Sequence, residues 1–174
     1  MLFAVASVLA SFERLRRVHR VAAFDLDALA RALGTAVGAS RLRQMADLMH
    51  GERPSWEGEL ILSVLQSRNP AERTASVNEY LGDVASALRW GSHIPVTAAR
   101  LSAAGPLCVL FFALARGAIA AAEIVPVIAW GGAGVVGALA TGREANRVAA
   151  EIRKAVDRWV ARVLEAASVR DSPS

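Results

Sequence analysis

The sequence predicts an all-α, multi-pass membrane protein with about three membrane helices and a helical cytoplasmic segment. Three observations predict this class. Hydrophobic residues make up 54% of the 174 residues, and the mean hydropathy is +0.35, which is high for a soluble domain of this size. The charges are unevenly spread, because between Leu101 and Gly142 only Arg116 and Glu123 are ionisable. Residues 13–100 never alternate between apolar and polar with period two, so no strands are predicted there.

Residues 1–20 are predicted to be a short membrane anchor with its basic flank. The apolar run MLFAVASVLASF comes first and the basic ERLRRVHR follows it. A signal peptide has the opposite order, and this order places the N-terminus outside and the flank in the cytoplasm. Twelve helical residues rise only about 18 Å, against a hydrocarbon core of about 30 Å. We therefore expect partners and local thinning of the bilayer to complete this helix, or the true start to lie upstream.

Residues 21–100 are predicted to form the helical cytoplasmic segment. Asp25 is in position to cap a helix within FDLDALARAL. Further helices are expected at about 41–49, 56–66 and 71–91, separated by Gly, Pro and Asn. Pro95 is expected in the first turn of the next helix.

Residues 101–142 are predicted to form a membrane hairpin. The blocks 101–122 and 124–142 are apolar and are bracketed by Arg100 and Arg143. Basic residues flank both outer ends, so the positive-inside rule places these ends in the cytoplasm. The hairpin therefore has its turn outside, and the C-terminus is cytoplasmic.

Residues 143–167 are predicted to be a cytoplasmic amphipathic helix, followed by a disordered tail at 168–174. Its apolar residues recur at steps of three and four, which places them on one face: Val148, Ile152, Val156, Trp159 and Val163. Such a face needs a partner helix to cover it.

The glycines of GGAGVVG admit two interpretations. Gly132, Gly134 and Gly137 have the spacing G-x-G-x-x-G of a dinucleotide-binding turn, which requires a strand before it and an acidic residue ending a second strand about 20 positions on. Pro126 disfavours a central strand in IVPVIAW, and the acids downstream lie in a helical pattern. The sequence favours the second interpretation, a small-residue face that lets membrane helices approach closely.

Several function classes find no support. The net charge of +4 comes mostly from arginines that alternate with acids along helical faces, which does not indicate a nucleic-acid surface. His50 near Asp47 and Glu52 lacks further ligands for a metal. The single cysteine, Cys108, is expected to be a buried, inert thiol. No catalytic set is indicated, so we expect no enzyme, no cofactor, no metal and no small-molecule substrate.

Taken together, the short anchor with ERLRRVHR, the helical segment and the hairpin resemble the MotA/TolQ/ExbB proton-channel family. AAGPLCVLFFALARG, residues 103–117, is similar to that family's second-helix motif, and the glycine-rich helix ending in ATGREANR is similar in placement to its third helix. The resemblance covers most of the chain in arrangement more than in identities. It implies a homo-oligomer, a pentameric ring, around a single-span ExbD/TolR-like membrane protein whose aspartate carries the proton.

The resemblance also implies where this chain departs from the family. Threonines of the second and third helices help to form the family's ion path. Here Ala113 stands at the second-helix threonine, and Gly131 and Gly132 or their neighbours stand at the threonine pair of the third helix. The residues expected to face the pore or partner are Pro106, Ala113, Gly131, Gly132, Gly134, Gly137 and Thr141.

The resemblance therefore implies a ring subunit of a TolQ/ExbB-like, ion-driven complex in the bacterial inner membrane. With alanine and glycine in place of the threonine hydroxyls, we expect a divergent member that keeps the assembly and either does not conduct ions or depends more on its partner for conduction. The alternative is a non-conducting membrane scaffold or accessory subunit that binds other membrane proteins. Arg116 either reaches the outer interface as a helix-end arginine or lines the interior of the ring.

Overall fold

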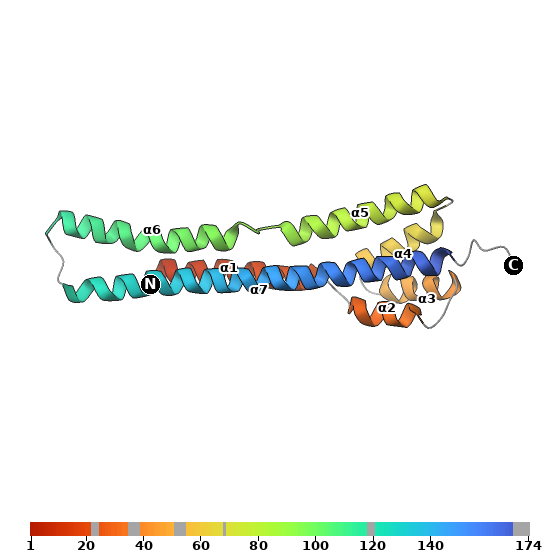
Figure 1. The fold of residues 1–174 in the computed structure, drawn as a ribbon, viewed down its shortest axis with the longest axis horizontal. Coiled ribbons are helices and arrows are strands. Elements are labelled where there is room, and N and C mark those ends of the chain that lie inside the picture. Colours follow the sequence, from red (N-terminus) through yellow and green to blue (C-terminus); the bar gives the residue numbers. More distant parts are fainter. Residues whose placement is uncertain (22–24, 35–38, 51–54, 68, 118–120, 169–174) are drawn as a thin grey trace. The chain divides into compact units, whose positions relative to one another are not determined.

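The computed structural model describes residues 1–21, 25–34, 39–50, 55–67, 69–117 and 121–168, and these are helical apart from short turns and caps (Figure 1). The all-α prediction is confirmed for this part of the chain. The helices are α1 (Leu2–Val21), α2 (Leu26–Gly34), α3 (Ala39–His50), α4 (Trp56–Gln66), α5 (Pro70–Arg89), α6 (Ile94–Ala115) and α7 (Ala121–Ser168).

The chain divides into two compact units. Unit 1 comprises Met1–Arg20 and Leu88–Ala149, and unit 2 comprises Val21–Ala87 and Ala150–Ser174. Helix α7 continues from one unit into the other, so the predicted hairpin and the predicted amphipathic helix share one helix. The predicted segment boundaries after residues 100 and 142 accordingly lie inside α6 and α7.

Small residues form the interior of unit 1, where α1 lies alongside α7 (Figure 1). A cluster of Ala98, Ala99 and Ala138 forms its core, with Val135 packed against it. Among the side chains that the structure describes in this unit, larger buried apolar ones occur only near the ends of its segments, at Val18, Leu88 and Val148. The small buried residues along the three helices include Ala4, Ser7 and Ser11 of α1, Pro95, Ala98, Ala99 and Ser102 of α6, and Gly131, Gly134, Ala138, Gly142 and Ala145 of α7.

Large apolar side chains lie on the outside of unit 1. In the described residues, every exposed large apolar side chain except Leu48 and Trp56 belongs to this unit. Unit 1 is thus the reverse of a water-soluble domain, in which large apolar side chains are buried and polar ones exposed. The set includes Leu2, Phe3, Val5, Leu9 and Phe12 of α1, Leu101, Leu107, Val109, Phe111, Phe112 and Leu114 of α6, and Val125, Ile128, Trp130, Val136 and Leu139 of α7.

Two stretches of described helix are long and apolar enough to cross a membrane, one within Pro70–Ala115 and one within Ile124–Ser168. The first corresponds to α6, because α5 carries charges along its whole length. Only 17% of each apolar window is buried, whereas the core helix of a soluble protein is mostly buried. The predicted third span is not confirmed, since the apolar part of α1 ends before Glu13 and Arg14.

Unit 2 packs like a soluble domain. Most of its buried side chains are apolar and many of them are large, and α3 packs on α4. These buried residues include Leu26, Leu33, Leu42, Met49, Leu60, Ile61, Val64, Val77, Val84, Val156, Trp159, Val160 and Val163. The face predicted for residues 143–167 is confirmed as buried, with Ile152 half-buried.

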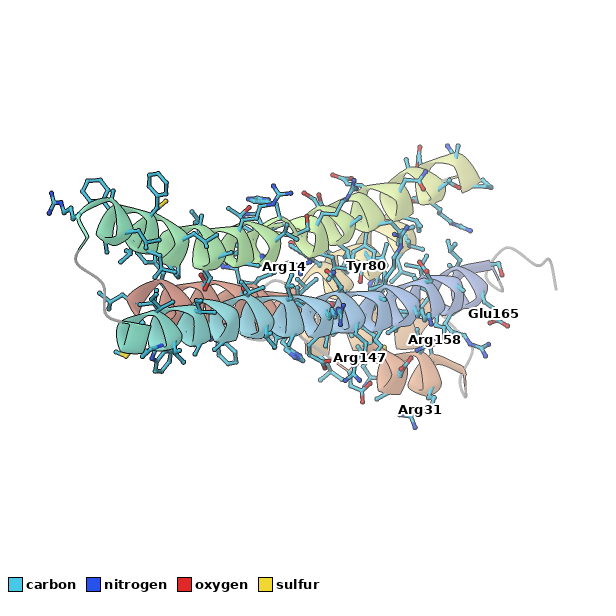
Figure 2. The ribbon with its side chains drawn as sticks, turned by 60° about the vertical axis from the view of Figure 1, so that its left-hand side comes forward. Arg14, Arg31, Tyr80, Arg147, Arg158 and Glu165 are labelled. Atoms are coloured by element: carbon cyan, nitrogen blue, oxygen red, sulfur yellow. The ribbon has the colours of Figure 1, made fainter. Side chains whose placement is uncertain are left out.

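Caps fix the helix starts of unit 2. The Asp25 carboxylate accepts hydrogen bonds from the N–H groups of Asp27 (3.1 Å) and Ala28 (3.0 Å), which confirms the predicted cap. The Ser55 hydroxyl accepts one from the N–H of Gly58 at 3.1 Å and begins α4. Arg158 of α7, labelled in Figure 2, donates two 2.9 Å hydrogen bonds to the Asp27 carboxylate of α2.

Candidate functional site

The seven residues predicted to face a pore or partner lie on α6 and α7 of unit 1. Gly131 and Gly134 are buried, and Gly132 is exposed. Pro106, Ala113, Gly137 and Thr141 are half-buried. The set therefore mixes positions used for packing within the chain with positions left on its surface.

Gly131 brings α7 against α6. A Cβ atom added to Gly131 would lie 2.9 Å from Cγ of Pro106 and 3.2 Å from the carbonyl oxygen of Ser102. The Ser102 hydroxyl donates a hydrogen bond to the Gly131 carbonyl oxygen at 3.2 Å. The structure thus places two of the predicted residues, Pro106 and Gly131, in contact, and only glycine allows this approach.

Pro106 changes the hydrogen bonding of α6. Proline has no N–H, so the Ser102 carbonyl four residues earlier lacks its helical donor. That carbonyl faces the backbone of Gly131, where a glycine Cα–H can make a weak hydrogen bond to it. In a hydrocarbon environment this matters, because water is not there to satisfy a free carbonyl.

Gly134 and Gly137 bring α7 against α1. An added Cβ at Gly134 would meet the Ser102 hydroxyl and lie 2.7 Å from Cα of Ala4. At Gly137 it would lie 2.7 Å from Cγ2 of Val8. These two glycines already have neighbours within the chain, and whether they also face a partner stays a prediction.

Sequence reasoning missed the serines on the other side of these contacts. The Ser7 hydroxyl donates to the Ala98 carbonyl oxygen and the Ser11 hydroxyl to the Ser7 carbonyl oxygen, each at 2.9 Å. Both serines are buried, and Ser102 is buried as well. The available signal was their spacing of four in α1 and the small residues at steps of three and four along α7.

Gly132, Ala113 and Thr141 differ from this packed set. An added Cβ at Gly132 would meet no atom within 4 Å, so this glycine leaves a free position on the outer surface. Thr141 bonds within its own helix, its hydroxyl donating to the Gly137 carbonyl oxygen at 2.7 Å.

A groove of about 200 Å³ lies among α1, α6 and α7. Its lining includes Phe3, Pro106, Pro126, Trp130 and Gly131 and is mostly apolar. The groove is large enough for a side chain or a segment of an acyl chain.

Two expectations about single residues change. Cys108 is exposed, so the prediction of a buried thiol is wrong. The reason is that α6 buries only its alanine and serine face and leaves most of its larger side chains outside. Arg116 caps the end of α6, exposed, with its guanidinium 5.0 Å from the centre of the Phe112 ring.

The dinucleotide interpretation is wrong. Gly132, Gly134 and Gly137 lie in the middle of α7, and the residues before them are helical too, so the strand and turn that a pyrophosphate site requires are lacking. The described residues hold no group of three or more side chains suited to a metal ion. Comparisons with protein-family models, curated proteins and solved structures gave no match.

Proposed function

We propose that this protein is a multi-pass inner-membrane subunit that assembles with copies of itself around a single-span partner, as the ring subunits of TolQ/ExbB-like ion-driven complexes do. The observation that carries the proposal is the packing of unit 1, with small and hydroxyl-bearing residues inside and large apolar side chains outside.

The cost of exposing the surface of unit 1 to water differs from the cost of exposing it to lipid. In water, exposed apolar area costs about 25 cal/mol per Å², and a surface as extensive as that of unit 1 would drive aggregation. In lipid no such cost arises, and helices associate through close packing of small residues and hydroxyl hydrogen bonds. The Ser7, Ser11 and Ser102 bonds and the glycines of α7 fit the second environment.

The same reasoning extends the membrane region to α1. Its apolar part is short, but its buried positions are Ala4, Ser7 and Ser11, and its exposed ones include Leu9 and Phe12. A helix that turns its serines inward and its leucines outward suits a lipid surrounding. With the basic flank inside, the proposal has three spans, an outside N-terminus and a cytoplasmic C-terminus.

Assembly would use positions that the chain itself leaves free. Gly132 is open, and the half-buried Pro106 and the exposed Trp130 line the groove. A partner helix or a second copy placed there could approach the backbone of α7 closely.

A second candidate function, the non-conducting scaffold, is favoured by one observation. The hydroxyls of Ser102 on α6 and Thr141 on α7 both donate hydrogen bonds to backbone carbonyls within the chain. An ion crossing hydrocarbon needs polar groups or water beside it, so a conducting ring would have to take them from the partner, whereas a scaffold needs none.

The deciding measurement is the native mass of the protein extracted together with its binding partners. A detergent-requiring complex of five copies supports the ring, and a detergent-requiring monomer or dimer moves the assignment to the scaffold. A protein that is soluble without detergent would overturn both. Proton flux through liposomes that hold the complete complex then separates a conducting ring from a non-conducting one.

A further inference from the structure

Arg14 is a buried cation with an incomplete set of partners. It lies on α1 in unit 1 (labelled in Figure 2) and is only 2% exposed. Its Nη2 donates a hydrogen bond to Oδ1 of Asn146 at 2.8 Å. In the described residues its Nε and Nη1 atoms have no hydrogen-bond partner.

Such an arrangement is costly. A guanidinium offers five N–H donors and keeps its charge, and an amide oxygen accepts a hydrogen bond without neutralising that charge. Burying a charge without an opposite charge costs several kcal/mol in proteins. The geometry therefore points to a missing anionic partner.

Unit 1 does not supply this anion from its own acids. It contains nine arginines and three glutamates. Glu13 pairs with Arg17 at 3.2 Å, and Glu144 pairs with Arg147 at 2.6 Å. The third, Glu123, precedes the apolar stretch of α7, whereas Asn146 follows it.

The position of Arg14 indicates the kind of anion. Arg14 follows the apolar run of α1, and Asn146 follows that of α7. The turn at Trp90–His93, which precedes the apolar run of α6, lies against α1, because Gly91 is close to the Arg14 side chain. All three elements therefore meet at the basic boundary of the apolar surface, which is the level of lipid headgroups.

An exposed aromatic residue marks the same boundary. The Arg17 guanidinium lies 4.0 Å from the centre of the Trp90 ring, and Trp90 is 47% exposed. Tryptophan beside arginine is typical of a membrane–water interface. Because Arg14 and Arg17 are three residues apart in α1, they lie on neighbouring positions of one helical face.

We propose that Arg14 and Arg17, beside the Trp90–His93 turn, bind the phosphate of an anionic phospholipid. Asn146, which is exposed, holds the Arg14 guanidinium in the lipid-free structure and gives way when the phosphate binds. Two phosphate oxygens accept the Nε and Nη N–H groups of Arg14 in the paired geometry that arginine favours. This inference rests on the membrane embedding of unit 1 and is independent of ring formation and ion flow.

The test measures the unfolding temperature of the detergent-solubilised full chain by tryptophan fluorescence. Phosphatidylglycerol, phosphatidylcholine and inorganic phosphate are each added at the same concentrations. We expect phosphatidylglycerol to raise the midpoint by about 3–5 °C at tenfold its dissociation constant, and the other two to raise it much less. A rise as large with inorganic phosphate would overturn the lipid assignment. Equal rises with the two lipids would overturn the site, in favour of a carboxylate from another chain.

Two variants and a control locate the effect. Arg14→Gln should lose most of the rise with phosphatidylglycerol, whereas Arg143→Gln, which removes an exposed charge at the same boundary, should keep it. Asn146→Asp supplies the missing carboxylate, so it should raise the lipid-free midpoint and abolish the lipid effect. If Arg14→Gln does not fold, Asn146→Asp alone decides, and an unchanged lipid effect in that variant overturns the proposal. A failure of membrane embedding is detected separately, at extraction without detergent.

Discussion

Gly132 and Gly134 stand two residues apart in α7 but face different surroundings. The backbone of Ala4 lies against Gly134, whereas in the part of the chain that the structure describes no atom lies within 4 Å of a Cβ added at Gly132. At the scale of single residues, the stability of unit 1 therefore depends on which positions are glycine, because a glycine such as Gly134 lets two helices approach closely.

The matched substitutions Gly134→Ala and Gly132→Ala test this dependence. Alanine at 134 must push away the backbone of Ala4, which cannot rotate aside, so we expect a loss of about 2 kcal/mol in the free energy of unfolding. Alanine at 132 enters open space and favours the helix, so we expect no loss and a gain of up to about 1 kcal/mol. Thermal unfolding in detergent measures both. Equal effects of the two substitutions would contradict the packing of α1 on α7.

Glu57 gives unit 2 a dependence on pH. It lies in the first turn of α4 and is buried, and burial raises the pKa of its carboxyl above the usual value. A raised pKa means that the folded state holds the proton more tightly than the unfolded state. Stability is therefore greatest below the unfolded pKa of about 4.3 and falls as the pH rises through the folded pKa.

Glu57→Gln should remove this slope and make the protein more stable than the wild type at neutral pH. Unfolding midpoints between about pH 4.5 and pH 8 measure the slope. Glu59→Gln, on the exposed side of the same turn, is the control and should keep it. A wild-type slope that survives in Glu57→Gln would show that another group titrates.

At the scale of elements, α1 carries its serines inward and its large apolar residues outward. Ser11 is fully buried, and Leu9, two positions earlier, is 62% exposed. The side-chain hydrogen bond from α1 to α6 stays within unit 1: the Ser7 hydroxyl donates to the Ala98 carbonyl oxygen.

Placing a large apolar side chain at a serine position of α1, or a serine at an exposed apolar position, tests this arrangement. In a soluble helix the polar residue would be on the outside and the apolar one inside. Ser11→Leu forces a large side chain into a closely packed interior and should cost about 1–3 kcal/mol in the free energy of unfolding in detergent. Leu9→Ser should leave that free energy nearly unchanged and instead weaken retention in the membrane fraction after carbonate washing. Destabilisation by Leu9→Ser alone would mean that α1 faces water with its serine side.

The bounds of most elements could be predicted because they depend on local chemistry. The helix at 56–66 is predicted from its flanking Pro, Ser and Asn and found as α4, and Asp25 caps α2 as expected. The continuity of α7 could not be predicted, because a glycine such as Gly142 after a long apolar run is typical of a helix end. The chain stays helical at Gly142, and the absence of a side chain on this glycine makes room for Pro95 of α6.

The candidate site could be predicted only in part. The small-residue face of α7 follows from spacing, but its partners depend on how the helices cross, which no local pattern encodes. Gly134 therefore meets Ala4 of α1, far away in the sequence. Whether Cys108 is buried likewise depends on which face of α6 packs, and that choice is made by Ala98, Ala99 and Ser102.

At the scale of the whole molecule, the two units differ in both solvent preference and charge. Unit 1 exposes its large apolar side chains and carries nine arginines against three glutamates, whereas in unit 2 the acidic residues outnumber the basic ones. The proposal places the first unit in the bilayer with its basic end at the cytoplasmic headgroups and the second unit in the cytoplasm. Two exposed positions can be used to test where the units lie, Cys108 in unit 1 and Leu48 in unit 2.

The single native cysteine allows this topology to be tested by thiol labelling. A charged maleimide reacts with a thiol in water and does not enter hydrocarbon, so in intact membranes Cys108 should react slowly although the isolated chain exposes it. Leu48→Cys in a Cys108→Ser background should react rapidly in inverted vesicles, because residue 48 is 78% exposed in unit 2. It should stay unlabelled in spheroplasts, because the proposal places unit 2 in the cytoplasm. Denaturation in detergent should make both thiols reactive, which controls for oxidation. If Cys108 in membranes reacts as fast as the thiol of the Leu48→Cys variant, unit 1 faces water, and the exposed apolar surface then requires a protein partner in place of lipid.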